Sequence, residues 1–266
     1  MCLRFIKALI LLFFCSIAFS HEYVFIPYHW RLHTGDVLEL HLFVADGFNV
    51  QLERPLQKEM TNRFELITSD GNQDLLTSQS EGAFPIYNYP INFKGQGLLH
   101  LERSASKIIL QNEKFAEYLK EDHMKYIHPD YKNHSEQSER YLRYIKSLVQ
   151  SDPIARDTTY RTIVGQRFEI ILLNDPYKLK IGQRIHAQIW FDHKPMKNKT
   201  VTIRQRTGGL ASTHQFSTTD SSGICSFLIN HKGDWFIHAT HMIPCPDQQD
   251  ALWESHWASY SFGIGF

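Results

Sequence analysis

Short apolar runs separated by turn-forming residues fill the last fifth of the chain, from Thr218 to Phe266. The segment Thr219–Gly223 predicts a tight turn, because an Asp side chain can bond its own backbone and Gly readily adopts a positive φ. A second turn at Lys232–Asp234 leads into Trp235–Met242, which has the composition of a buried strand and carries two histidines. This part of the chain is therefore expected to anchor a β-sheet core.

The same pattern extends back through the C-terminal half. Residues Arg184–Phe191 alternate so that Ile185, Ala187 and Ile189 share one face, which is the period of a half-buried strand. Further strands are predicted at Phe168–Leu173 and Thr200–Arg206. About seven short strands joined by turns within about 100 residues indicate an immunoglobulin-like or transthyretin-like β-sandwich.

The N-terminal part is also expected to be rich in β-strands. Val37–Val44 places Leu38, Leu40, Leu42 and Val44 on one face, and short apolar segments separated by turns follow as far as residue 110. The fold class that these patterns predict is mainly β, with two β-sandwich-like domains. We place the domains at residues 21–160 and 161–266, because a polar run between Asp152 and Gly165 precedes a new β pattern.

A helical insertion is predicted in the N-terminal domain, at about residues 112–150. Asn112 is a suitable N-cap, and Phe115, Tyr118 and Leu119 recur at helical spacing. After a polar passage broken at Pro129, a second apolar stripe at helical spacing is formed by Tyr141, Leu142, Tyr144, Ile145, Leu148 and Val149. The pattern thus predicts two short helices joined by a loop.

Residues 1–20 have the features of a secretory signal peptide. Arg4 and Lys7 precede the apolar run Ala8–Ala18, and small residues end the segment at Ser20. The apolar run is about half the length that a bilayer-spanning helix needs, so we expect cleavage near Ser20, no membrane span afterwards and a periplasmic or secreted protein. The charges balance, with 28 basic and 28 acidic residues in the whole chain, which argues against a nucleic-acid partner.

Only Cys225 and Cys245 remain after cleavage, and two interpretations of them are open. In an oxidising compartment they can form one disulfide if their Cα atoms lie within about 7 Å. Cys225 also sits in an apolar strand pattern, which suits a buried inert thiol equally well.

Fifteen histidines make a metal role worth testing, because neutral imidazole binds nickel, copper, cobalt and zinc. His21 is the first candidate, since cleavage would leave its α-amine and imidazole on one residue. His238 and His241 are candidate partners, but residues three apart on a regular strand point to opposite faces. Glu254 and His256, before the last strand, complete the predicted set. The alternative is that these are ordinary sheet and strand-entry residues held by hydrogen bonds.

Signatures of catalysis are missing from the sequence. It contains no HExxH, CxxC or Gly-x-Ser-x-Gly motif and no phosphate-binding glycine loop. The sequence therefore predicts a protein that is not an enzyme.

Several segments together suggest a family. They are His21–Phe25, Glu139–Leu148, Val164–Tyr177, His193–Pro195, Thr219–Gly223, Gly233–Trp235, His238–Met242 and Trp253–Phe262. In this ordered set the chain resembles the bacterial periplasmic family of unknown function catalogued as "nickel uptake substrate-specific transmembrane region". The resemblance implies a Gram-negative periplasmic protein with a β-rich N-terminal part, a helical insertion, a β-sandwich C-terminal domain and an association with nickel uptake.

Two functional hypotheses follow from these observations. The first is a soluble periplasmic protein that binds a divalent transition metal, as an accessory to nickel or cobalt uptake, with an inner-membrane or outer-membrane uptake component as partner. The second is a metal-free β-sandwich interaction module that binds an envelope protein or glycan. Convergence of the candidate histidines would favour the first, and an exposed aromatic patch would favour the second.

Overall fold

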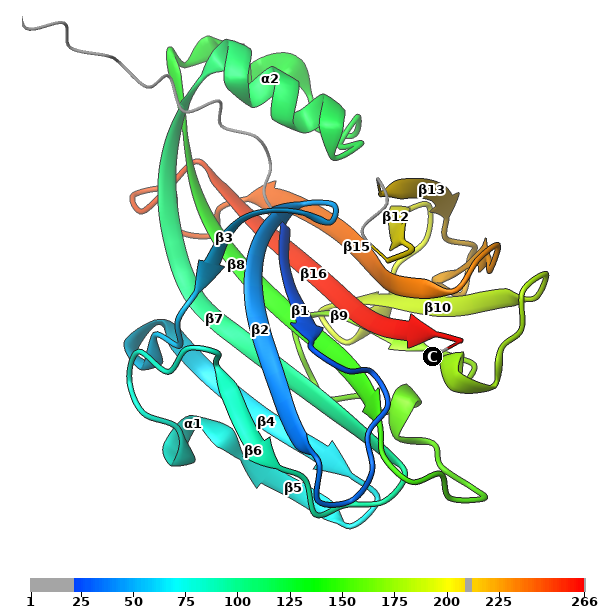
Figure 1. Ribbon diagram of the computed structural model, residues 1–266. Helices are drawn as coiled ribbons and strands as arrows, with labels where there is room; N and C mark the ends of the chain where they lie inside the picture. Colours follow the sequence, from blue (N-terminus) through cyan, green and yellow to red (C-terminus); the bar gives the residue numbers. More distant parts are fainter. Residues whose placement is uncertain (1–21, 209–211, 266) are drawn as a thin grey trace, which may run out of the picture.

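The computed structural model describes residues 22–208 and 212–265, and over these residues the chain forms sixteen β-strands in three sheets (Figure 1). The predicted signal segment and the candidate ligand His21 lie outside the described residues. The mainly β fold class is confirmed. No helix in the described part of the chain has the length and apolar character needed to cross a bilayer.

An eight-stranded sheet forms the middle layer of the molecule. Its strands, in spatial order, are β13 (Thr213–Thr218), β12 (Thr200–Arg206), β15 (Gly233–Pro244), β16 (Trp253–Ile264), β8 (Glu136–Gln150), β7 (Gln96–Gln111), β4 (Thr61–Thr68) and β5 (Gly71–Asp74). The two halves of the chain meet where β16 pairs in parallel with β8, seen in Figure 1 as red beside green. The predicted boundary near residue 160 therefore separates two halves of the sequence, but both halves contribute strands to the central sheet.

A smaller sheet covers one face of this middle layer. It consists of β1 (Glu22–Pro27), β2 (Val37–Asp46), β3 (Asn49–Arg54) and β6 (Tyr87–Pro90). The alternation predicted for β2 is confirmed, because Leu38, Leu40 and Leu42 are buried. Ser259 and Ser261 of β16 donate hydrogen bonds to backbone carbonyls of β1, and each donor–acceptor distance is 2.6 Å.

The third sheet covers the opposite face of β16. It is built from β9 (Phe168–Leu172), β10 (Arg184–Phe191), β11 (Lys194–Pro195) and β14 (Ile224–Leu228). Ile185, Ala187 and Ile189 of β10 are buried as predicted, and they pack in one cluster with Ile237 and Tyr260 of the middle sheet. The predicted C-terminal β-sandwich is thus confirmed, and its second layer is the shared central sheet.

The helical insertion is shorter than predicted. The helix α2 (Asn112–Glu121) and a 3-10 turn, η2 (Pro129–Asn133), are followed by strand β8 rather than by a second helix. The prediction was wrong because β8 is covered on both faces, so its apolar residues do not alternate and their spacing imitates that of a helix. The remaining short elements are η1 (Lys58–Met60), α1 (Leu75–Ser78), η3 (Thr159–Arg161) and η4 (Pro176–Lys178).

Cys225 and Cys245 are both free thiols, which corrects the disulfide alternative. Cys225 is buried in β14, where its thiol lies 3.6 Å from the carbonyl oxygen of Ala187. Cys245 is buried directly beyond β15, in a different sheet. Burial raises the pKa of Cys225 to about 12, so this thiol stays protonated and unreactive at neutral pH.

Candidate functional site

The candidate histidines of β15 lie on opposite faces of the middle sheet. His241 is the register partner of His256 on β16, and its ring packs 4.6 Å from that of Phe191 in the third sheet. The His238 ring instead packs 5.8 Å from that of Trp257. The prediction that the strand period separates His238 from His241 is confirmed, so these two residues belong to two different environments.

On the face toward the third sheet, Glu254 and His256 already have hydrogen-bond partners. The two ring nitrogens of His256 lie 3.2 Å from the Tyr144 hydroxyl and 3.1 Å from a carboxylate oxygen of Glu254. Although burial by itself raises its pKa, hydrogen bonds from Arg140 and Arg167 hold the pKa of Glu254 below the ordinary value. A carboxylate neutralised by two guanidinium groups is a poor ligand for a cation.

The imidazoles on this face are nevertheless neutral. Burial lowers the pKa of His241 to about 3 and that of His256 to about 4. The Tyr126 hydroxyl lies 3.0 Å from Nδ1 of His241 and also accepts a hydrogen bond from the Met242 amide. His241, Glu254 and His256 are therefore all engaged in hydrogen bonds within the protein, and we do not retain them as metal ligands.

The opposite face carries a cavity of about 250 Å³ near the start of β1. Acidic and basic side chains from distant parts of the chain line it, namely Glu22, Asp46, Glu121, Asp122, Arg204, His214 and His238. They come from β1, the last residue of β2, the C-terminal end of α2 with the residue after it, and strands β12, β13 and β15. The sheet register explains part of this arrangement, because Thr202 of β12 pairs with His238 and brings Arg204 to the same face.

Two carboxylates face the His238 ring in this cavity. Its Nε2 atom lies 3.8 Å from Oδ1 of Asp122 and 3.0 Å from the Thr240 hydroxyl. Glu22 is almost fully buried, and burial raises its pKa, while the nearby His238 and Arg204 lower it. The Glu22 carboxylate accepts hydrogen bonds from the Gly47 amide, at 2.7 Å, and from Arg204, at 3.4 Å.

An imidazole beside carboxylates suits a divalent transition metal. Within residues 22–208 and 212–265, however, no group of three or more His, Cys, Asp or Glu side chains is arranged to hold a metal ion. The described residues therefore supply too few ligands for a metal ion, and a complete metal site needs further donor atoms from residues outside them. His21, which immediately precedes Glu22 in the chain, is the predicted ligand that lies outside the described residues.

Sequence patterns did not identify Glu22, Asp122 or His214. Asp122 follows the last residue of α2, and its carboxylate approaches His238 only through tertiary packing. That packing is apolar, since Phe115, Tyr118 and Leu119 of the helix cluster with Met242 and Trp257 of the middle sheet. The one signal available in the sequence was the position of Glu22 next to the predicted N-terminus.

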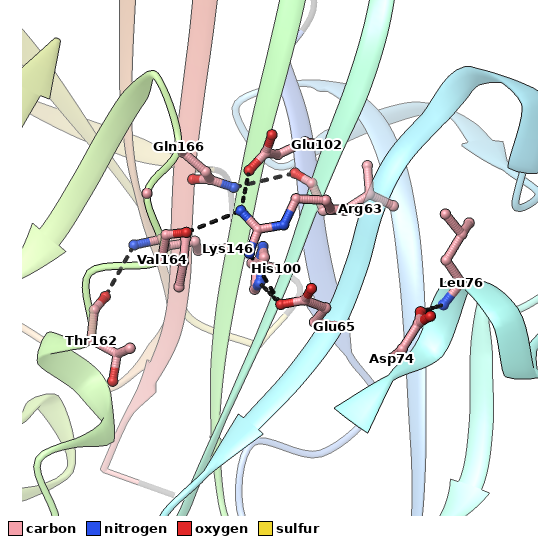
Figure 2. A network of polar contacts seen from close by, with 12 residues as sticks. Arg63, Glu65, Asp74, Leu76, His100, Glu102, Lys146, Thr162, Val164 and Gln166 are labelled. Atoms are coloured by element: carbon pink, nitrogen blue, oxygen red, sulfur yellow. Dashed lines mark hydrogen bonds and ion pairs between the residues drawn. The ribbon is translucent and has the colours of Figure 1, made fainter. Parts of the chain in front are cut away.

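A second polar cluster lies on β4 and β7 (Figure 2). Arg63 donates hydrogen bonds to Glu102, at 3.0 Å, and to Glu65, at 3.2 Å, as well as to the carbonyl oxygen of Val164. His100 lies 2.9 Å from Glu65, and burial lowers its pKa to about 4. Since the cluster ties residue 164 to the sheet, we interpret it as a structural link between the halves of the chain.

Comparison with known proteins identifies a family but no functional precedent. A family model described as "Domain of unknown function (DUF4198)" matches residues 18–243. No curated protein matches the chain. Among solved structures, the "D0-D1 domain of Intimin" is 12% identical with a TM-score of 0.21, covering 90% of this chain and 96% of that one. A "Marsupial T cell receptor" chain is 8% identical with a TM-score of 0.22, covering 91% and 73%.

Proposed function

The chain belongs to the family of unknown function DUF4198, and we propose that this member binds a divalent transition metal in the cavity at the start of β1. The observation that carries the proposal is the approach of the His238 imidazole to the Asp122 carboxylate beside buried Glu22. An imidazole with carboxylate neighbours has the donor chemistry that nickel, cobalt, zinc and copper accept. The acidic lining also compensates the charge of a bound cation.

The free N-terminus would supply the missing donors. If the signal peptide is cleaved after Ser20, the α-amine and imidazole of His21 become available directly beside Glu22. Together with His238 and Asp122 they give four donors of mixed nitrogen and oxygen type, which is a complete set for a tetrahedral or square-planar ion. Metal binding would then depend on correct processing, because an uncleaved chain has no α-amine at this position.

We extend the same proposal to the location of the protein and to the metal that it carries. A periplasmic protein that captures nickel or cobalt with its N-terminus can serve as an accessory to an uptake system, delivering the ion to an inner-membrane or outer-membrane component. The support for this role is the resemblance to the family catalogued with nickel uptake, together with the signal-like residues 1–20. Ligands at the chain terminus suit delivery, since a terminal segment can release an ion without unfolding the sheets.

The test is calorimetric titration of correctly cleaved protein with nickel, cobalt, zinc and copper. We expect one ion to bind, with release of protons because the ligands must deprotonate. His238→Ala and Asp122→Asn should each weaken the affinity at least about tenfold, since each removes a donor. A chain with one extra residue before His21 should lose affinity similarly.

His241→Gln is the matched control. It lies on the same strand three residues away and faces the third sheet, so its substitution should leave the metal affinity unchanged. Affinity no better than millimolar for all four ions would overturn the proposal. Equal effects of His238→Ala and His241→Gln would also contradict it, because the loss would then reflect a general disturbance of β15.

A further inference from the structure

A second cavity, of about 450 Å³, opens at the opposite end of β1. Its lining combines aromatic and charged side chains, among them Tyr28, His29, Trp30, Phe43, Arg206 and Asp234. The volume falls in the range of small-ligand sites, which are concave, largely apolar and furnished with a few oriented polar groups. None of the residues that we assign to metal binding lines this cavity.

Aromatic rings contribute to the lining of the cavity, and the ring of Tyr28 is exposed. Tyr28 is 70% exposed, and its ring lies 4.7 Å from that of His29 in an edge-to-face arrangement. His41 stacks on Phe43 with the ring centroids 5.5 Å apart and the planes inclined by only 6°. These rings give the site flat apolar surfaces bordered by polar atoms.

The segment that carries the exposed ring is held by backbone hydrogen bonds on both sides. The Tyr28 amide donates to the carbonyl oxygen of Glu39 on β2, at 2.9 Å. Two residues later, the carbonyl oxygen of Trp30 accepts from the Gln150 amide of β8, and the Leu32 amide donates back to the Gln150 carbonyl oxygen. A large aromatic side chain is therefore exposed on an ordered segment, which lowers the entropic cost of binding a ligand.

The charged groups of the cavity compensate one another. Arg206 donates two hydrogen bonds to Oδ2 of Asp234, at 3.0 and 2.6 Å, and the Trp30 indole donates to Oδ1 at 2.8 Å. Arg31 donates to the carbonyl oxygen of Tyr177 at 3.1 Å. His41 lies between the carboxylates of Glu39 and Glu53, at 3.0 and 2.6 Å. Fixed donors and acceptors of both signs suit hydroxyl groups, each of which donates and accepts.

We propose that this cavity binds a neutral oligosaccharide, with the apolar face of one pyranose ring on Tyr28 and its hydroxyl groups directed to the Arg206–Asp234 pair. A ligand anion would meet the carboxylate of Asp234, and a quaternary ammonium would meet the guanidinium groups of Arg31 and Arg206. A neutral polyhydroxylated ring with one apolar face avoids both repulsions. The site does not depend on metal binding.

The experiment is a titration of the cleaved protein, in the presence of EDTA, with three neutral hexasaccharides. These are maltohexaose, cellohexaose and fully N-acetylated chitohexaose. Chemical shifts and calorimetry are followed, and polygalacturonate and choline serve as anionic and cationic comparison ligands. We expect at least one neutral hexasaccharide to bind with millimolar or tighter affinity. Tyr28→Ala should weaken that binding at least about threefold, the loss expected for one stacked ring.

Tyr89→Ala is the matched control, because Tyr89 is 48% exposed and does not line this cavity. Arg206→Gln provides a second probe, which should also reduce saccharide affinity while circular dichroism confirms the fold. The proposal is overturned if no neutral hexasaccharide binds at 10 mM, if polygalacturonate or choline binds more tightly, or if Tyr28→Ala and Tyr89→Ala have equal effects. Since EDTA is present throughout, none of these results bears on metal binding.

Discussion

The ammonium group of Lys146 and the carboxylate of Glu169 form an ion pair, 2.6 Å long, in which both side chains are buried. The pair joins β8 in the middle sheet to β9 in the third sheet. Lys146 also donates to the carbonyl oxygen of Ile170, and Glu169 accepts hydrogen bonds from the amides of Val164 and Gly165. Both charges are thus satisfied, and the segment between the two halves is attached to the sheet at this point.

Replacing Lys146 with methionine should destabilise the protein strongly. The substitution leaves the Glu169 carboxylate buried without its cation, which costs about 3–5 kcal/mol in the free energy of unfolding. Urea denaturation of Lys146→Met and the parent protein measures this difference. Lys107→Met is the control, because the Lys107 side chain is 60% exposed in its pair with Asp250 and should contribute little. Equal losses in the two variants would show that the buried pair has no special role.

Glu139 should make the protein less stable as the pH rises from about 4.5 to about 7. Burial raises the pKa of Glu139 to about 7, although hydrogen bonds from Ser255 and Tyr118 oppose the shift. Between its ordinary value of 4.5 and about 7, the folded state therefore holds a proton that the unfolded chain releases. The free energy of unfolding should fall by up to about 1.4 kcal/mol per pH unit in this window and level off above it.

The variant Glu139→Gln should abolish that contribution. Denaturant unfolding between pH 4.5 and pH 8 is the measurement, with each variant compared with the parent protein at every pH. The exposed neighbour on the same strand, Glu136, supplies the control substitution Glu136→Gln. An unchanged pH profile for Glu139→Gln would mean that Glu139 is already ionised in the folded state at acidic pH.

Gly233→Ala should destabilise the protein more than Gly71→Ala. Both glycines have positive φ angles, of 129° and 139°, so either substitution strains the backbone by about 1–3 kcal/mol. A β-carbon at Gly233 would in addition collide with the carbonyl oxygen of Arg206, whereas nothing lies within 4 Å of the corresponding position at Gly71. The melting temperatures of the two variants give the comparison, and the prediction is wrong if they fall equally.

The two cysteines of the cleaved protein should be reduced and shielded. Alkylation under native conditions should modify Cys225 very slowly, because its thiol is buried and remains protonated. After unfolding, two thiols should react, and mass spectrometry should show both modified. A mass lower by two hydrogens, with no reaction after unfolding, would establish a disulfide instead.

Sequence reasoning located most strands wherever one face of the strand is buried. In β2 and β10 the apolar residues alternate, because one side packs on a neighbouring sheet and the other side meets solvent. The prediction was wrong at β8, where Tyr144 and Leu148 pack toward the third sheet while Ile145 and Val149 pack toward the first. Burial on both faces removes the alternation by which a strand is recognised.

For the candidate site, the sequence by itself determined that His238 and His241 face opposite ways, because side chains alternate along a strand. It also placed Glu22 next to the predicted N-terminus. Only the tertiary structure decided that Asp122, at the end of α2, approaches His238. It also decided that the Glu254 carboxylate forms ion pairs with Arg140 and Arg167. Local periodicity reports the environment of one element, whereas a ligand set depends on contacts between residues about a hundred positions apart, which only packing fixes.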